Sequence, residues 1–534
     1  MKNRGILKAM LVLAIIITPS LGFSQKQLIK KTPIVSKIKD LQRVRNEALF
    51  GGLLVWPNGV KNGSNPNPKF GATVNSNRAF TGCAPTVGKF PPMPSLAQHK
   101  AILDNIKTQT TKKLTQEKIL LRFLSYVRIE SQSIDDPDPN TFPMTEGQKR
   151  IAEFIYNEIK GFGEGVDVKL SPDYYIYARV PSNMDKDVPS VLFLAHMDVT
   201  PEANGNGIKP QVHRRYKGGD IALGNGLVLS PYAPAGAHLK DCIEKTIVTS
   251  DGTTLLGADD KTGCAILVTM IEQIVKESSF KHGDVYVCLS QNEDVAKCAD
   301  RMDLSYFDKM PDILVDVDGG SYGEVSVSNF TAEGRTYLFE GNLAHPSYGK
   351  EYGYADARTA MGYFLGQIPP ELNPAHSEGK QGYIHCYDIQ QLTNKQDVRL
   401  RFRLRYFDKK DGMRYQQILD NALSKTKQAY PEVKISMEDS SLQYENIAYS
   451  MHPKAVEVIS RAAKKMKIPM RTIDLRAGTT ASLMVAKGLP GGPCIYSGQN
   501  AEHSVYEWTC IEDLVEITDL CQEIVKEISK LKLN

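Results

Sequence analysis

The chain has 534 residues, of which 41% are hydrophobic and 24% are charged, and its formal net charge is +4. This composition is typical of a soluble globular protein with enough material for two compact domains and additional segments. The charge is nearly balanced and forms no basic stripe, so we expect no nucleic-acid partner and no attraction to an anionic membrane.

Nine cysteines occur without CxxC spacing. In an exported chain at least one thiol would stay unpaired, and no disulfide can be assigned from the spacing.

The amino terminus has the layout of a secretory signal peptide. Three basic residues within the first eight precede an apolar run at 9–17, and small residues follow as far as Ser24. A membrane anchor is the alternative, but the run is short for a bilayer span. We therefore expect cleavage of residues 1–24, export to the periplasm or the medium, and no stable membrane span afterwards.

Residues 25–113 carry no catalytic signal, and positions 57–94 are crowded with Asn, Gly and Pro. Such a stretch is expected to be mostly loop. A structural extension is the simplest interpretation, and a pro-segment or a partner-binding arm is the alternative.

From residue 114 onwards, helical and β-rich patterns alternate. Helices are expected from 114 and from 145, where Thr145 and Gln148 resemble a capping box. Alternation of strands with amphipathic helices predicts an α/β fold, a mixed sheet layered with helices. The expected strands are 174–180, 191–195, 284–290 and 313–317, and the next helix is 261–276.

Between 330 and 444 the rhythm changes to strand 336–340, helix 355–365, strand 383–389, strand 398–406, helix 412–429 and strand 433–437. This order is the ferredoxin-like βαββαβ unit, and it predicts a domain inserted into the first one. Helices from 453 and from 511 then indicate that the main domain resumes. The expected organisation is a catalytic domain in two parts, 114–329 and 445–534, with the inserted domain 330–444 between them.

The stretch 192–199, LFLAHMDV, is expected to be a buried strand that ends at a histidine and a carboxylate. Because side chains alternate along a strand, His196 and Asp198 project to the same side. A neutral imidazole binds zinc well, and a nearby aspartate orients the ring. Alone, this motif is more often a hydrogen-bonded structural histidine.

Further acids and a histidine follow at the ends of predicted strands or the start of a helix. They are Asp259 and Asp260 in GADDKTG, Glu293 and Asp294 in NED, Asp316 and Asp318 in DILVDVD, and His503 with Glu507 four residues on. Each has an ordinary explanation as a helix cap or a solvated loop acid. Together they are placed where open α/β sheets build their sites, and they are suitable ligands for a pair of zinc-like ions.

These motifs closely resemble the peptidase T family, which consists of tripeptide aminopeptidases related to carboxypeptidase G and aminoacylase, all dizinc metallopeptidases. The resemblance extends from about residue 114 to the carboxyl end. It is carried by HMDV (196–199), GGDIALG (218–224), VLSP (228–231), SDGTTLLGADDKTG (250–263), NED (292–294), VDGG (317–320), HP (345–346), RAGT (476–479) and HSVYE (503–507).

The resemblance implies a zinc-exopeptidase-like fold with a ferredoxin-like lid or dimerisation domain, and two Zn²⁺ per chain, with Co²⁺ or Mn²⁺ as alternatives. It assigns the metal ligands by position, with Asp259 bridging both ions and the bond to Asp260 often cis. Asp198 would tune the first histidine, and Glu293 would be the general base for a metal-bridging hydroxide. The implied ligands are His196, Asp259, Asp294, Asp318 and His503.

Three further residues match family positions near the substrate. His345, in the inserted domain, would support the developing oxyanion. Arg405 and Arg476 are suited to a bidentate grip on a carboxylate, with a surface ion pair as the alternative for each.

Two positions depart from the family pattern. Asp294 replaces a glutamate. Thr480 replaces an acid near the substrate, and this replacement weakens the expectation of strict tripeptide specificity.

We expect an exported aminopeptidase for tripeptides or other short peptides, with a homodimer through the inserted domain as an option. The alternatives are a carboxypeptidase or N-acyl amino acid amidohydrolase with the same metals, and a non-catalytic peptide-binding homologue.

Overall fold

A computed structural model describes residues 111–134, 138, 141–392 and 396–532. The predicted signal peptide, and all but the last three residues of the predicted extension, lie outside the described residues. Contacts divide the chain into units 1–114 and 115–534, and the second unit holds the elements that build the site. No helix in the described ranges is both long and apolar enough to cross a bilayer.

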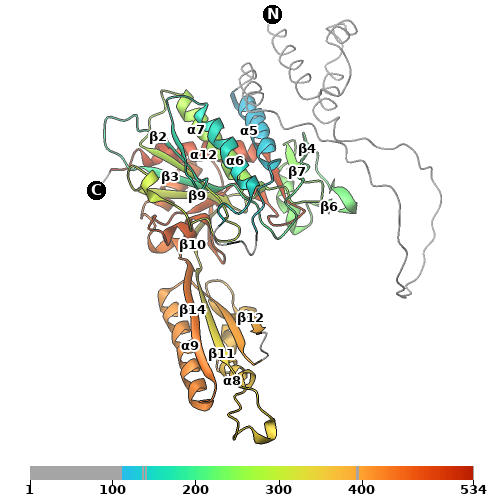
Figure 1. The fold of residues 1–534 in the computed structure, drawn as a ribbon. Helices are drawn as coiled ribbons and strands as arrows, with labels where there is room; N and C mark the ends of the chain where they lie inside the picture. The colour runs from blue at the N-terminus through green and yellow to red at the C-terminus, as the bar shows by residue number, and fades with distance from the viewer. Residues whose placement is uncertain (1–110, 135–137, 139–140, 393–395, 533–534) are drawn as a thin grey trace, which may run out of the picture. The chain divides into compact units, whose positions relative to one another are not determined.

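The main domain is built on an eight-stranded mixed sheet in the order β1-β2-β8-β3-β9-β16-β10-β15. Strand β3 lies parallel to both β8 and β9, in the middle of the sheet (Figure 1). The strands are β1 (Asp167–Leu170), β2 (Ile176–Val180), β3 (Val191–His196), β8 (Val285–Ser290), β9 (Ile313–Gly319), β10 (Glu324–Asn329), β15 (Arg471–Leu475) and β16 (Cys494–Tyr496).

Both faces of this sheet are covered, which explains why β3 is apolar along its whole length. Val191, Phe193 and Ala195 enter the larger core, whereas Leu192 and Leu194 enter a smaller core on the opposite face. The larger core is filled by α5 (Thr111–Val127), α6 (Glu146–Lys160), α7 (Ala258–Lys276), α10 (Ala455–Met466) and α12 (Ile511–Ile528), and the smaller by α11 (Thr480–Val485).

The predicted capping box at α6 is half correct. The Thr145 side chain accepts a hydrogen bond from the backbone of Gln148 at 3.4 Å, as expected for an N-cap. The Gln148 side chain does not return the bond to Thr145. It accepts from the backbone N–H of Met144 and donates to Ser133, so a tertiary contact replaces the local one.

A second, smaller sheet has the order β17-β18-β7-β4 and was not predicted. Its strands are only two or three residues long, too short for an alternation pattern to reveal. This sheet pairs the end of the chain with a segment some 260 residues earlier, since Trp508 lies opposite Thr249. The strands are β4 (Gln211–His213), β7 (Ile247–Thr249), β17 (Gln499–Asn500) and β18 (Trp508–Cys510), and a separate hairpin joins β5 (Ile221–Ala222) and β6 (Val228–Leu229).

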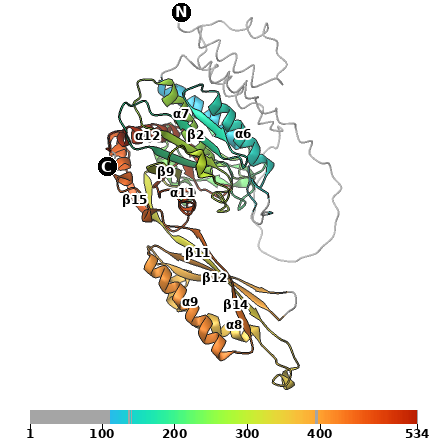
Figure 2. The same ribbon diagram turned by 60° about the vertical axis from the view of Figure 1, so that its left-hand side comes forward.

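The inserted domain has the predicted βαββαβ order, and its antiparallel sheet runs β12-β13-β11-β14. Side chains at alternate positions of β13 are buried against α8 and α9, as expected for a sheet with helices on one face (Figure 2). The predicted fold class is confirmed. The elements are β11 (Thr331–Glu340), α8 (Ala357–Leu365), β12 (Tyr383–Gln391), β13 (Val398–Tyr406), α9 (Lys409–Ala429) and β14 (Lys434–Tyr444).

A buried ion network ties α5, α6 and α7 together. Arg122 is fully buried, and its guanidinium bonds Glu158 on α6 at 2.7 Å and Glu272 on α7 at 2.8 Å. Lys118 also pairs with Glu272 at 2.7 Å. Removing one member of such a network leaves an uncompensated buried charge. The network therefore fixes the position of α7, whose first turn carries Asp259.

Replacing Glu272 by glutamine is expected to lower the free energy of unfolding at pH 7 by about 3 kcal/mol. Despite the opposing effect of burial, Arg122 and the lysines hold the pKa of Glu272 well below its usual range. Its stabilisation is therefore present above the unfolded pKa of about 4.3 and is lost as the pH falls below it. Urea unfolding between about pH 7 and pH 3 should show a flatter pH dependence for E272Q than for wild type. E277Q, at the exposed end of the same helix, is the control, and equal pH slopes in E272Q and wild type would contradict this prediction.

Candidate active site

Three strand ends meet at one edge of the large sheet. Strands β3, β8 and β9 are parallel, so their carboxyl ends point the same way. His196 is the last residue of β3, Asp318 is near the end of β9, and the NED segment follows β8 after one residue, Gln291. The sequence pattern alone predicts that these three groups lie close together, because each of them follows the carboxyl end of a strand and the three strands run in the same direction.

Asp259 reaches the same edge from the first turn of α7. Gly257 precedes it with φ of 77°, a left-handed conformation that glycine adopts easily. The bond between Asp259 and Asp260 is cis, as the family resemblance implies. The side chain of Asp260 turns back under the site and accepts hydrogen bonds from the backbone of His196 at 3.3 Å and of Gly263 at 3.1 Å.

The loop that carries Asp259 is held by Glu507, whose role sequence reasoning did not identify. Its buried carboxylate accepts backbone N–H bonds from Leu256 at 2.6 Å, Gly257 at 2.5 Å and Asp259 at 3.1 Å. Burial, with the charge of Asp259, raises the pKa of Glu507 to about 8. The one sequence feature that could have indicated this role is the position of Glu507 four residues after His503, within the short β17–β18 connection.

Asp259 stands between the two histidines. Its Oδ1 lies 3.0 Å from His196 Nε2, and its Oδ2 lies 3.2 Å from His503 Nε2. Asp318 Oδ1 is 3.7 Å from His196 Nε2, and Asp294 Oδ1 is 2.9 Å from His503 Nε2. The ligand atoms therefore form two groups that share Asp259. Each group has three ligand atoms within 4.8 Å of one another, His196 with Asp259 and Asp318, and His503 with Asp259 and Asp294.

Asp198 lies behind His196 and organises the NED loop. Its Oδ1 is 3.4 Å from His196 Nδ1 and accepts from the backbone of Glu293 at 3.0 Å. Its Oδ2 accepts from Ser133 Oγ at 2.6 Å and from the backbone of Asp294 at 3.3 Å. With both oxygens engaged, Asp198 is a positioning residue and not a free ligand, although His196, Asp198 and Asp294 form a third close group.

The electrostatics of the edge suit divalent cations. Burial and the neighbouring carboxylates raise the pKa of Asp318 well above its usual range, and that of Glu293 to about 8. Hydrogen bonds to Asp259 and Asp294 raise the pKa of His503 to about 12. Divalent cations bound here would offset the charge of these crowded carboxylates. Asp294 Oδ2 is buried without a hydrogen-bond partner, an acceptor left over for a metal ion.

Glu293 faces the same edge, where its carboxylate approaches the imidazole of His196. Its Oε2 is 3.9 Å from His196 Nε2, and its side chain is 13% exposed. Asn292, just before it, has φ of 59°, an uncommon left-handed conformation that turns the chain sharply after β8. The carboxylate of Glu293 is thus able to exchange protons with a molecule bound over the two ligand groups.

The three residues matched to substrate positions are not gathered at this edge. His345 is exposed, and its ring contacts Ser347 and Tyr348 on its own turn. The guanidinium of Arg405 lies over the ring of Tyr444 and bonds Gln443. Their substrate roles stay predictions.

Arg476 is already engaged within the protein. Its guanidinium donates to the carbonyl oxygens of Gly379 at 2.7 Å, Gln381 at 3.0 Å and Ser377 at 3.2 Å, and it lies over the ring of Phe330. These contacts join the β15–α11 loop of the main domain to the inserted domain. A grip on substrate would require Arg476 to exchange some of them.

The position where the family has an acid is filled by Thr480, the first residue of α11. Thr480 is fully buried, and its Oγ1 has no hydrogen-bond partner. Thr479 is the N-cap, and its reciprocal bonds with Ser482 start the helix. The departure from the family pattern is therefore accommodated inside the fold and leaves the two ligand groups intact.

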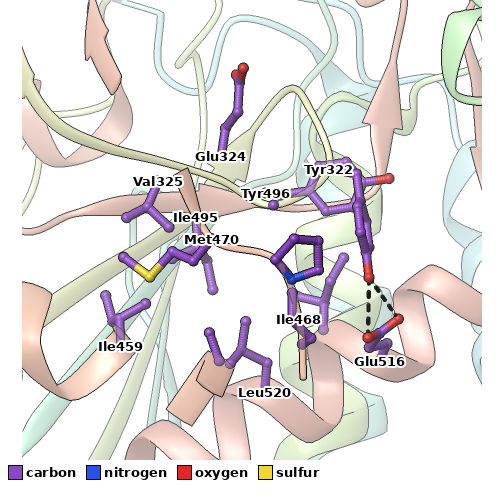
Figure 3. A pocket seen from close by; sticks show the side chains of 14 residues that line it. Tyr322, Glu324, Val325, Ile459, Ile468, Met470, Ile495, Tyr496, Glu516 and Leu520 are labelled. Atoms are coloured by element: carbon purple, nitrogen blue, oxygen red, sulfur yellow. Dashed lines mark hydrogen bonds between the residues drawn. The ribbon is translucent and has the colours of Figure 1, made fainter. Parts of the chain in front are cut away.

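A small cavity elsewhere in the main domain is unrelated to this chemistry. It is lined mainly by apolar side chains of α10, α12, β10 and β16, including Ile459, Leu520 and Ile495 (Figure 3). Its volume of about 20 Å³ has room for little more than one water molecule. None of the predicted site residues lines it.

Comparison with known proteins identifies relatives of this chain. No model of a protein family matches the chain. The chain is 33% identical to peptidase T of Geobacillus sp. (strain WCH70) over 416 residues, which cover 77% of this chain and 98% of that protein. It is 32% identical to peptidase T of Caldanaerobacter subterraneus over 421 residues, 77% of this chain and 99% of that protein.

Solved structures show the same fold. The aminopeptidase PepT of Bacillus cereus matches with a TM-score of 0.60 and 19% identity, over 78% of this chain and 99% of that one. A tripeptidase of Staphylococcus aureus matches with a TM-score of 0.58 and 18% identity, over 78% of this chain and 99% of that one. The sequence identity, its extent and the fold together lead to one conclusion: the chain belongs to the peptidase T family of metallopeptidases.

Proposed function

We propose that this chain is a dizinc aminopeptidase that removes the first residue of tripeptides or other short peptides. One observation carries the proposal. The carboxylate of Asp259 offers one oxygen to the group with His196 and the other to the group with His503, at 3.0 Å and 3.2 Å. Two histidines with carboxylates suit Zn²⁺, with Co²⁺ or Mn²⁺ as alternatives.

The division of labour follows from the positions of the side chains. When bound, two divalent cations would lower the pKa of a water molecule between them and polarise the scissile carbonyl. Glu293 accepts the proton of the attacking water and delivers it to the leaving amine. Asp198 keeps the His196 ring and the Glu293 backbone in register through one oxygen, Oδ1.

Blocked peptides separate this proposal from its nearest rival. After metal removal and reconstitution with Zn²⁺, the protein should release the first residue of free trialanine and should fail on N-acetyl-trialanine. Trialanine amide is the matched control, because blocking the carboxyl end alone should be tolerated better. Faster hydrolysis of the N-acetylated peptide would identify an amidohydrolase or carboxypeptidase, and saturable binding without products would identify a peptide-binding homologue.

We also propose that the chain is exported and that it pairs through the inserted domain. The charged start and apolar run of residues 1–17 support export. Exposed Tyr387 and Ile389 on edge strand β12, and Met437 and Leu442 on edge strand β14, support pairing through an edge of the inserted sheet. Expression in a bacterial host should yield a periplasmic protein that begins near Gln25, and sedimentation should give twice the chain mass. A protein that keeps residue 1, or that sediments as a monomer, would contradict the respective part.

A further inference from the structure

Both histidines of the two ligand groups have a carboxylate next to Nδ1 of the ring. His196 Nδ1 lies 3.4 Å from Asp198 Oδ1, and His503 Nδ1 lies 3.0 Å from Glu202 Oε2. In each ring it is Nε2 that approaches the shared carboxylate of Asp259. The family resemblance gives Asp198 a role, but it gives none to Glu202.

The loop that carries Glu202, between β3 and β4, is held in place by Gln132. The side-chain amide of Gln132 donates hydrogen bonds to the carbonyl oxygens of Thr200 at 2.8 Å and Ala203 at 2.6 Å, on either side of Glu202. Its amide oxygen accepts from Asn206 Nδ2 at 3.1 Å. The backbone N–H of Glu202 bonds Thr200 Oγ1 at 3.3 Å. The backbone of Glu202 is therefore fixed, although its side chain is exposed.

The carboxylate of Glu202 determines which ring nitrogen of His503 carries the proton. An ionised carboxylate only accepts hydrogen bonds, so the nitrogen that faces it, Nδ1, must be the donor. In a neutral imidazole the other nitrogen, Nε2, then keeps its lone pair. This nitrogen lies 3.2 Å from Asp259 Oδ2 and 2.9 Å from Asp294 Oδ1. A metal-binding histidine typically donates its other N–H to such an acceptor, which fixes the ring and raises its basicity.

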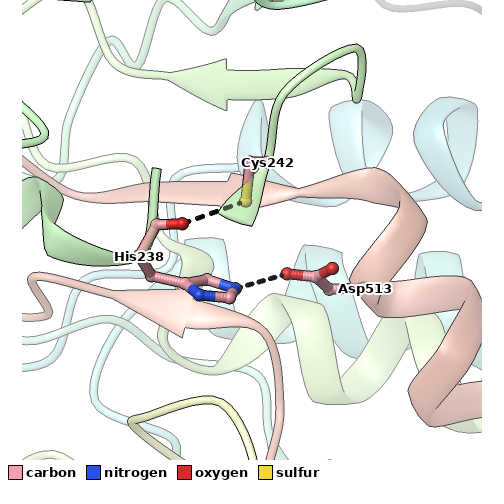
Figure 4. Close-up of side chains that lie close together, drawn as sticks. All are labelled: His238, Cys242 and Asp513. Atoms are coloured by element: carbon pink, nitrogen blue, oxygen red, sulfur yellow. Dashed lines mark hydrogen bonds and ion pairs between the residues drawn. The ribbon is translucent and has the colours of Figure 1, made fainter. Parts of the chain in front are cut away.

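A second histidine–carboxylate pair in the main domain shows what a purely structural arrangement looks like. His238, Cys242 and Asp513 also have ligand-type atoms within 4.8 Å of one another (Figure 4). One oxygen of Asp513 pairs with His238 Nε2 and the other with Lys245 Nζ, each at 2.8 Å. This cluster is complete without an ion. In the His503 group, by contrast, Asp294 keeps a buried oxygen without a partner.

An ordinary surface ion pair is the competing explanation for the contact between Glu202 and His503. Their side chains are 67% and 34% exposed, and ion pairs this exposed contribute little to folding stability. Such a pair would affect the protein equally with and without bound metal. A residue that orients a metal ligand has its effect when the ion is bound.

We propose that Glu202 is a positioning residue for the second metal ion: it keeps the proton of His503 on Nδ1 and leaves Nε2 free to bind a divalent cation. The inference rests on the proposed function, because it requires an ion bound by His503, Asp259 and Asp294. It makes the two histidines equivalent in design, with Asp198 behind one ring and Glu202 behind the other.

The test measures zinc binding by the full chain after metal removal. Competition with a chelator of known affinity gives the dissociation constant of each Zn²⁺ ion. In E202A, one of the two ions should bind about 10- to 100-fold more weakly than in wild type, and the other should be unchanged. E202Q keeps an acceptor oxygen and should lose less affinity. Without metal, E202A should melt within about 2 °C of wild type.

Two further variants show whether the effect passes through His503. Glu502 is exposed and precedes this histidine, so E502A removes the same charge without removing the Nδ1 contact, and it should bind both ions normally. In H503N, which keeps one ion, adding E202A should leave the affinity for that ion unchanged.

Three results would overturn the inference. They are wild-type affinity for both ions in E202A, equal losses in E202A and E502A, and weaker binding of the remaining ion in H503N/E202A than in H503N. None of them changes the hydrolysis of trialanine by wild type, which tests the proposed function separately. A wild-type chain that binds no zinc would overturn both.

Discussion

Replacing Glu293 by glutamine should lower kcat for a free tripeptide by about 10²- to 10⁴-fold, the range expected when a general base is removed. Glutamine keeps the shape of the side chain but cannot take the proton of the attacking water. The backbone N–H of residue 293 still bonds Asp198, so the loop and the metal ligands should stay in place. Metal content should therefore match that of wild type, and KM should change little.

The control for this variant is D300N, which changes an exposed acid shortly after the same loop. It should hydrolyse trialanine at the wild-type rate. Steady-state kinetics and metal analysis on the same preparations distinguish loss of the general base from loss of metal. Near-normal kcat in E293Q, at unchanged metal content, would remove Glu293 from the assigned role.

Replacing Asp259 by asparagine should have the largest effect on metal binding, because this carboxylate is shared. We expect the metal content to fall from two ions to fewer than about one per chain, and hydrolysis to fall by at least about 10³-fold. An amide has the same shape but no negative charge, and it cannot present an anionic oxygen to each group. The packing of the first turn of α7 should be retained, which circular dichroism can check.

A comparison variant distinguishes the shared ligand from an unshared one. Position 503 has φ of 58°, which asparagine tolerates well, so H503N should fold. It should lose one ion and keep the other with His196, Asp259 and Asp318. If D259N retains two ions per chain, or if H503N and D259N lose the same number, the bridging arrangement is wrong.

The sequence alone determined the elements whose signals are local. Apolar residues alternate with arginines along 398–406, and this alternation predicted the bounds of β13 without error, because five inward side chains repeat at every second position. The continuous apolar run before His196 predicted a strand at 191–195, and β3 (Val191–His196) extends one residue further. Since β3, β8 and β9 are parallel and end together, the grouping of His196, Glu293 and Asp318 also followed from the sequence pattern.

Only the tertiary structure decided the contacts between segments that carry no pattern of their own. The strands that bring His503 to Asp259 are two or three residues long. In the sequence, nothing distinguishes Glu507 from the other acids. In the structure, its oxygens accept hydrogen bonds from three backbone N–H groups some 250 residues earlier. Arg476 likewise seemed available for substrate, whereas it bonds three carbonyl groups of the inserted domain.

The burial of Cys242 and Cys510 in one apolar cluster belongs to the same class of features. Their separation along the chain says nothing about their distance in space, because nine scattered cysteines allow many pairings. Periodicity and turn chemistry act over a few residues, and so they can be recognised in the sequence. Pairing of distant segments depends on how whole layers pack, a property of the folded chain and not of any short stretch.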